Sequence, residues 1–297
     1  MSDIRVSDTL MADRLRRRRT WRGTKNNLFT AVMIAALVLV MIPLVLVIGT
    51  VVKRGASVMG LDFLTKDIPV RSRAKGPGMG PAIVGTFLIT AVAAAIAIPL
   101  GVLGAIYLNE YGSNRLLPRF VRFMSYVMTG VPSIVMGLFV YVIFTLRFGL
   151  EGLGGAIALA CLMLPIVIRS TEEMLRLVPG GLREASLALG SRRSRTIVTV
   201  VMPAALPGVV SGCLLAVARA AGETAPLIFT IGAATKLNVN PFHQATTALS
   251  TQIFANATSP FVGAQERAWG AALTLVGIAF AFTVVARMVA ARFAARR

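Results

Sequence analysis

The stretch EASLALGSRRSRTIVTVVMP, residues 184–203, decides how the rest of the chain is interpreted. Its first part has small side chains on one face of a short helix, which Gly190 is placed to end. A basic run, Ser191–Arg195, follows before the sequence turns apolar toward Pro203. Short helices with small side chains suit docking into a groove on a partner protein, but an interfacial helix lying on lipid would look the same.

The residues just upstream predict a second short helix. Ser170–Glu173 reads Ser-Thr-Glu-Glu, a capping-box pattern that favours a helix start, and Pro179–Gly181 predicts its end. The next helix then covers Leu182–Leu189. Residues 170–203 are therefore expected to form a loop of two short helices on the surface of a larger domain.

That larger domain is built from long apolar blocks, each long enough or nearly so to cross a bilayer, for which about 20 residues suffice. The 297 residues are 56% hydrophobic and only 14% charged, too few charges for a soluble domain. Six blocks are expected to span the membrane: Leu28–Val52, Ala82–Leu108, Phe123–Leu146, Leu153–Ile168, Ala204–Ile231 and Trp269–Ala290. Because the blocks are continuous and do not alternate, we expect an all-α polytopic helix bundle and not a barrel.

Basic residues indicate the orientation of the bundle. They crowd before the first block and after the last one, a placement typical of cytoplasmic flanks and of contact with anionic lipid. With six spans, both termini lie in the cytoplasm, so residues 1–27 form a basic cytoplasmic tail and 28–297 a transmembrane domain. The net charge of +19 is thus explained without nucleic acid. The outward segment Lys53–Pro81 is also basic, and the positive-inside pattern does not explain it.

Several other classes of protein are disfavoured. The first apolar block is too long for the core of a cleavable signal peptide and should remain as a span. Cys161 and Cys213 both lie in apolar blocks, which suits packing, and the single His243 and the cysteines have no metal-site spacing. No G-x-x-x-x-G-K-[ST] phosphate loop occurs, so we expect neither a bound cofactor nor ATP hydrolysis by this chain.

Charged residues within the apolar blocks mark a candidate substrate path. Arg219 and Glu223 are four residues apart, so they share a helix face and can pair. Arg219 lies about 24 Å along a helix that starts near Pro203, which is inside the bilayer core or near its far edge. Ionisable residues there usually face water or each other, and the planar fork of arginine suits phosphate. Simple mutual neutralisation is the alternative for this pair, and simple membrane anchoring is the alternative for Arg169.

Residues 184–203 resemble the EAA loop of ABC-importer permeases. The family pattern is E-A-A, three residues, G, nine residues and I-x-L-P; here Glu184-Ala185-Ser186, Gly190 and Val200–Pro203 fit it, with Ser for Ala, Val for Ile and Met for Leu. In that family the loop is a coupling helix seated in a cleft of the ATPase subunit. The resemblance implies that Glu184, Ala185, Ser186, Gly190 and Pro203 form the ATPase-coupling segment, with Glu184 contacting the ATPase.

Further stretches resemble the phosphate-importer permeases. They are Gly80–Thr86, Val131–Gly137, Leu164–Glu173 and Ala218–Pro226, and the ending Gly-Glu-Thr-Ala-Pro is more similar to the PstA type than to its sister, the PstC type. The resemblance implies the type I ABC-importer permease fold, the bacterial inner membrane, and Arg219, Glu223 and Arg169 along the substrate path. It also implies two copies of an ATPase, a PstC-type second permease and an extracytoplasmic phosphate-binding protein as partners.

The expected function is therefore the import of inorganic phosphate by alternating access. Two alternatives stay open from the sequence. One is a permease for another oxyanion, such as phosphonate, sulfate or molybdate, and the other is a membrane sensor or scaffold that moves nothing. A passive channel is disfavoured, because it would not need an ATPase-docking loop.

Overall fold

Every regular element is helical among the residues that the computed structural model describes, which are 22–71, 73, 78–112, 116–240 and 244–294. The predicted tail therefore lies outside the described residues over 1–21, as does His243. The chain divides into two compact units, Met1–Lys53 and Arg54–Arg297. The first contains most of helix α2 (Arg22–Ala56), whose apolar side chains from Leu28 to Ile48 are exposed, as a membrane-spanning helix requires.

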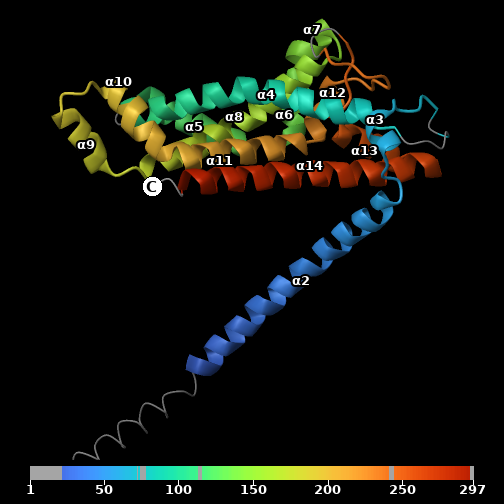
Figure 1. Cartoon of the computed structure of the whole chain (residues 1–297), viewed down its shortest axis with the longest axis horizontal. Helices are drawn as coiled ribbons and strands as arrows, with labels where there is room; N and C mark the ends of the chain where they lie inside the picture. The colour runs from blue at the N-terminus through green and yellow to red at the C-terminus, as the bar shows by residue number, and fades with distance from the viewer. Residues whose placement is uncertain (1–21, 72, 74–77, 113–115, 241–243, 295–297) are drawn as a thin grey trace, which may run out of the picture. The chain divides into compact units, whose positions relative to one another are not determined.

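The second unit is a bundle of long helices with short elements at both ends (Figure 1). The long helices are α4 (Gly80–Ile106), α5 (Leu116–Gly130), α8 (Gly152–Arg176), α11 (Met202–Ala221) and α14 (Val262–Ala294). The short ones are α3 (Leu61–Thr65), α6 (Ser133–Val140), α7 (Leu146–Phe148), α9 (Gly180–Ala188), α10 (Arg193–Thr196), α12 (Ala225–Thr230) and α13 (Leu249–Ala257). Three π-helical turns, η1 (Tyr107–Tyr111), η2 (Tyr141–Thr145) and η3 (Ile197–Val201), adjoin α4, α6 and α11. Helices α9 and α10 lie at one end of the bundle, and α3 and α13 at the other.

Among the described residues, five helical stretches are long and apolar enough to cross a membrane, and a bent pair makes a sixth candidate. The five are Lys25–Ala56, Gly80–Tyr111, Gly152–Arg176, Arg193–Ala221 and Val262–Val289. The sixth combines Leu116–Gly130 with Ser133–Phe148, which meet at 106°. The prediction of an all-α bundle with about six spans is confirmed.

The third predicted span, however, is not one straight helix. It breaks at Gly130–Pro132, between α5 and α6. Pro132 has no N–H to donate and disfavours the α conformation at Val131, so the helix cannot continue. The fourth span remains the shortest of the five single-helix candidates, but at 25 residues α8 extends beyond the predicted Leu153–Ile168 and is long enough to cross a membrane.

Helix α8 also corrects the prediction that a new helix begins at Ser170. The helix continues through Ser170–Glu173 without a break. The Ser170 hydroxyl donates to the carbonyl of Val167, and the Glu173 carboxylate pairs with Arg169 one turn earlier. The side chains of Ser170 and Glu173 therefore find their partners within a helix and do not cap its start.

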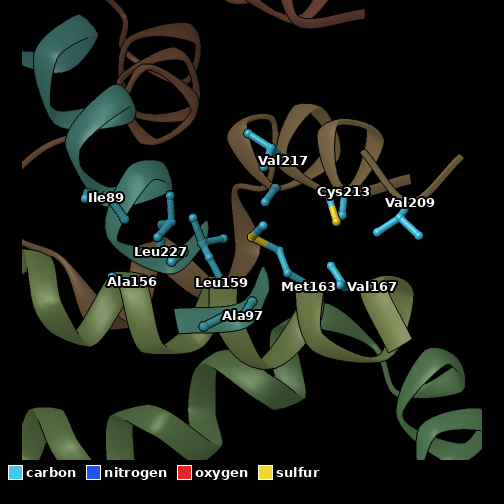
Figure 2. Close-up of a cluster of buried hydrophobic side chains, with 14 of the residues drawn as sticks. Ile89, Ala97, Ala156, Leu159, Met163, Val167, Val209, Cys213, Val217 and Leu227 are labelled. Atoms are coloured by element: carbon cyan, nitrogen blue, oxygen red, sulfur yellow. The ribbon is translucent and has the colours of Figure 1, made fainter. Parts of the chain in front are cut away.

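Helix α8 is the centre of the packing. Its residues Ala156, Leu159, Met163 and Val167 meet α4, α11 and α12 in one buried cluster (Figure 2). Small residues let the backbones approach closely, as is common between membrane helices. A Cβ on Gly101 of α4 would lie 2.7 Å from a methyl carbon of Val167.

A glycine also allows close packing near α13, at the end of the bundle opposite α9, where α4 contacts the segment that precedes α13. A Cβ on Gly85 would lie 1.9 Å from the carbonyl oxygen of Thr247, so the two backbones are in direct contact. The neighbouring Thr86 hydroxyl accepts a hydrogen bond from the N–H of Leu249 at 2.8 Å. The segment before α13 is thus bonded to α4 and is not a free loop.

We predict that Gly85→Ala destabilises the chain by about 1–3 kcal/mol, because the added methyl group overpacks a backbone contact. The measurement is the thermal unfolding midpoint of the full chain in detergent. The control is Gly277→Ala in α14, where an added Cβ meets nothing within 4 Å. An unchanged midpoint for Gly85→Ala would contradict the close contact.

Candidate functional site

Helix α9 presents two of the predicted coupling residues at the surface. Glu184 and Ala185 are exposed, and Ser186 is half-buried. Gly190 follows the helix with φ of +80°, a left-handed conformation that glycine adopts easily, and the Ser191 N–H closes back on the carbonyl of Ser186. Gly190 therefore ends the helix as the sequence predicted.

Ser186 faces inward and holds the loop together. Its hydroxyl lies 2.9 Å from that of Thr196, which is buried at the end of α10. Pro203 lies in the first turn of α11, directly after the π-helical turn η3, where the helix continues without a break. These contacts connect α9 through α10 and η3 to α11 as one continuous structure.

A salt bridge that the sequence did not predict also holds α9. Arg183 reaches the carboxylate of Glu110 in η1, at 3.0 Å from Nη2 and 3.3 Å from Nε. The same guanidinium donates to the carbonyls of Val178 and Leu175. Arg193 donates to the backbone carbonyl of Glu110. Glu110 and Arg183 are 73 residues apart, so no sequence spacing could have joined them.

A second unpredicted cluster lies beside the first. The carboxylate of Glu172 on α8 accepts from Arg122 on α5 and from Arg176, each at 2.7 Å, and is only 9% exposed. Arg122 also donates to the carbonyl of Leu108 in η1. The turn η1 is therefore bonded directly to α5, α9 and α10, and Arg122 links it to Glu172 of α8.

Arg219 and Glu223 line a cavity formed by residues of α5, α6, α8 and α11. The Arg219 Nε is 3.8 Å from Glu223 Oε1, a loose ion pair in which Arg219 is 71% exposed and Glu223 is 22% exposed. The cavity measures about 260 Å³. Besides this pair it is lined by residues of the α5–α6 break, including Thr129, Pro132 and Ser133, and by Met163, Pro165 and Ile166 of α8.

The chain is interrupted at this pair, which Gly222 and Pro226 bracket; both residue types favour the end of a helix. Helix α11 ends at Ala221 and α12 begins at Ala225, so Glu223 stands between two helices. The Ser250 hydroxyl of α13 donates to the backbone carbonyl of Glu223 at 2.9 Å, so a residue from another helix bonds to the interrupted segment. Two broken helices, α5–α6 and α11–α12, therefore meet at one cavity.

Arg169 does not join this cavity. Its Nε pairs with Glu173 at 3.1 Å, and its guanidinium lies 5.4 Å from the centre of the Tyr126 ring. It lines a separate space of about 10 Å³, room for no more than a water molecule, together with Arg122 and Glu172. The structure thus brings Arg219 and Glu223 together and places Arg169 elsewhere.

Nothing in the described part of the chain forms a metal site. No group of three or more His, Cys, Asp or Glu side chains could hold an ion there. Cys161 and Cys213 are free cysteines within α8 and α11, and Cys213 is part of the buried cluster.

The sequence of this chain matches a known protein family. Residues 97–297 match the family of binding-protein-dependent transport system inner membrane components. The phosphate transport system permease protein PstA 1 of Mycobacterium tuberculosis (strain H37Rv) is 41% identical over 280 residues, which cover 93% of this chain and 90% of that protein. PstA of Yersinia pestis is 38% identical over 291 residues, covering 98% of both chains.

The solved structures that are similar share the fold at low sequence identity. A chain of the MetNI methionine ABC transporter in an inward-facing conformation superimposes with a TM-score of 0.57 at 20% identity, covering 73% of this chain and 94% of that one. A chain of an amino acid ABC transporter solved with histidines gives a TM-score of 0.51 at 18% identity. The bundle is therefore that of an ABC-importer permease.

We predict that Ser186→Ala destabilises the α9 loop by about 1–3 kcal/mol, because it leaves the buried Thr196 hydroxyl without its partner. The measurement is hydrogen exchange over residues 182–196. In the double variant Ser186→Ala/Thr196→Val, the loss should largely disappear, since neither polar group remains. Additive losses in the double variant would show that the two hydroxyls do not interact.

Proposed function

This chain belongs to the family of binding-protein-dependent transport system inner membrane components, and from that premise we propose that it is the permease subunit of an ATP-driven importer of inorganic phosphate. The observation that carries the proposal is the likeness to PstA permeases, which extends over nearly the full length of both chains. The cavity at Arg219 supports the choice of an anionic substrate.

Arg219 is the residue that would meet phosphate. Its guanidinium is always charged and offers a planar fork of donors to phosphate oxygens. The pair with Glu223 is long, at 3.8 Å, and Arg219 is largely exposed, so an incoming phosphate can replace the carboxylate as its partner. The hydroxyls of Thr129 and Ser133 line the same cavity and can add hydrogen bonds.

Glu223 would keep this contact brief. Its carboxylate repels phosphate and competes for the same guanidinium, so phosphate binding at Arg219 stays weak. A transporter needs such weakness, because tight binding on the path would slow release. Arg169, nearer the α9 end of α8, is proposed as a later point of contact when that end of the path opens.

The energy would come from partner subunits. The sequence has no phosphate loop, so ATP hydrolysis belongs to an ATPase, and a permease of this family works with one and with a substrate-binding protein. We propose two copies of the ATPase, a PstC-type second permease and a phosphate-binding protein. Exposed Glu184 and Ala185 on α9 would seat in the ATPase, and Gly190 and Pro203 would fix the ends of that segment.

The proposed orientation follows from α9. If α9 docks on an ATPase, the end of the bundle with α9 and α10 faces the cytoplasm, and the end with α3 and α13 faces outward. Alternating access would then be a two-state change, in which the ATPases favour one state by their contacts with α9.

We predict that Arg219→Gln lowers phosphate uptake about 10- to 100-fold, the expected loss of a charge-assisted hydrogen bond to the substrate. Arg219→Lys keeps the charge but lacks the planar fork of donors, so its uptake should lie between that of wild type and that of Arg219→Gln. The measurement is uptake of radiolabelled phosphate at micromolar concentration in cells that lack this gene and carry each variant, with equal membrane levels confirmed. Arsenate should compete and sulfate should not. Unchanged uptake in Arg219→Gln would refute the proposed path, and competition by sulfate alone would favour another oxyanion.

We predict that Glu184→Lys abolishes uptake by a different route, because a reversed charge on α9 prevents its docking. The ATPase should no longer co-purify with the permease, while it should still co-purify with Arg219→Gln. Normal co-purification with Glu184→Lys would show that Glu184 does not hold the ATPase. Uptake that never depends on the gene would instead favour a sensing or scaffold role.

A further inference from the structure

Arg183 stands next to the proposed docking residue and joins α9 to a different helix. It precedes Glu184 in the sequence, yet its guanidinium is turned inward and is only 22% exposed. There it binds the Glu110 carboxylate and two carbonyls just after or near the end of α8, those of Leu175 and Val178. One side chain therefore connects α9, the end of α8 and the π-helical turn η1.

The acceptor of this contact is buried, and one of its oxygens has three donors. Glu110 is only 7% exposed, and its Oε1 accepts from Nε and Nη2 of Arg183 and from the side chain of Asn109 at 2.8 Å. A buried ion pair is rarely the best choice for stability alone, since apolar residues of similar volume often serve as well or better. Its directional bonds do provide a defined attachment between two elements.

The turn η1 passes this attachment on to the bundle. It continues directly from α4, and its Leu108 carbonyl accepts from Arg122, which binds Glu172 on α8. A movement of η1 would therefore displace α4, α5 and α8 as well. The covalent routes from α9 are different: one leads back through residues 177–179 to α8, and the other runs through α10 and η3 into α11, the helix that carries Arg219.

Both routes pass through a π-helical turn, η1 at the end of α4 and η3 at the start of α11. Such turns are rare and occur frequently at functional sites, where a helix changes its winding. Helix α9 is thus attached on two sides to places where long helices depart from regular geometry.

Resting on the proposed function, we infer that the Arg183–Glu110 ion pair is the attachment through which ATPase-driven movement of α9 reaches α4, in parallel with the covalent route to α11. Arg183 and Glu110 are positioning residues, because neither meets phosphate. With the pair intact, α4, α8 and α11 move together when α9 moves. With the pair broken, α9 still docks through Glu184 and stays connected to α8 and α11 through the chain, but it loses its side-chain attachment to the Glu110 carboxylate, and the path opens poorly.

The test uses the complete importer, with its ATPases, second permease and binding protein, in proteoliposomes. ATP hydrolysis and phosphate uptake are measured together, with and without phosphate-loaded binding protein. For Arg183→Gln and Glu110→Gln we expect assembly and basal hydrolysis within about twofold of wild type, and at least a tenfold loss of stimulation and of uptake. The double variant should be no worse than either single variant, because both remove the same contact.

The control is Arg119→Gln, which removes an arginine that is exposed on α5 near the same end of the bundle and should change nothing. Full stimulation in Arg183→Gln, or losses that multiply in the double variant, would overturn the inference. Should the Gln variants fail to assemble, Arg183→Lys keeps the charge but cannot reach all three acceptors; assembled complexes with full stimulation would again overturn it. The wild-type arm tests the proposed function separately, because absence of phosphate uptake there refutes the substrate and not the attachment.

Discussion

The close approach of α8 to α4, α11 and α12 is the constraint on which the rest of the structure depends. It is possible because glycines stand at points of closest approach: a Cβ on Gly101 would collide with Val167, and one on Gly155 would lie 2.5 Å from the Ile231 side chain. With helix backbones this close, little room is left for polar side chains within the bundle. Charged residues are consequently placed where helices break or end, at the Arg219 cavity and around η1.

The two places serve different proposed tasks. At the cavity, the pair of Arg219 and Glu223 is loose and open, which suits a site that must take and release an anion. Around η1, Glu110 and Glu172 are buried and closely bonded, which suits elements that must transmit force without changing partners. The same residue types thus have opposite properties, and burial accounts for the difference.

Much of this arrangement could be predicted from local sequence. Continuous apolar blocks predict spans, Gly190 predicts the end of α9, and Gly222 with Pro226 predicts the break at Glu223. Pro132 also favours a helix break, but it lies within a continuous apolar block, which predicts a single span. The Ser170 capping box was misleading because the same residues are also satisfied inside a helix. No local sequence pattern indicates the Glu110–Arg183 pair, because the two residues are 73 apart and only the fold brings them together. The cytoplasmic orientation of the termini stays a prediction.

Accumulation of phosphate against its gradient would show whether this chain forms an ATP-driven path for phosphate. The importer containing this chain would be reconstituted in proteoliposomes, and internal phosphate compared with external phosphate, with and without ATP. We expect internal phosphate to exceed the external concentration only when ATP and loaded binding protein are both present. Equilibration without ATP would indicate a channel, and no entry under any condition would indicate a scaffold or sensor; either result would contradict the account.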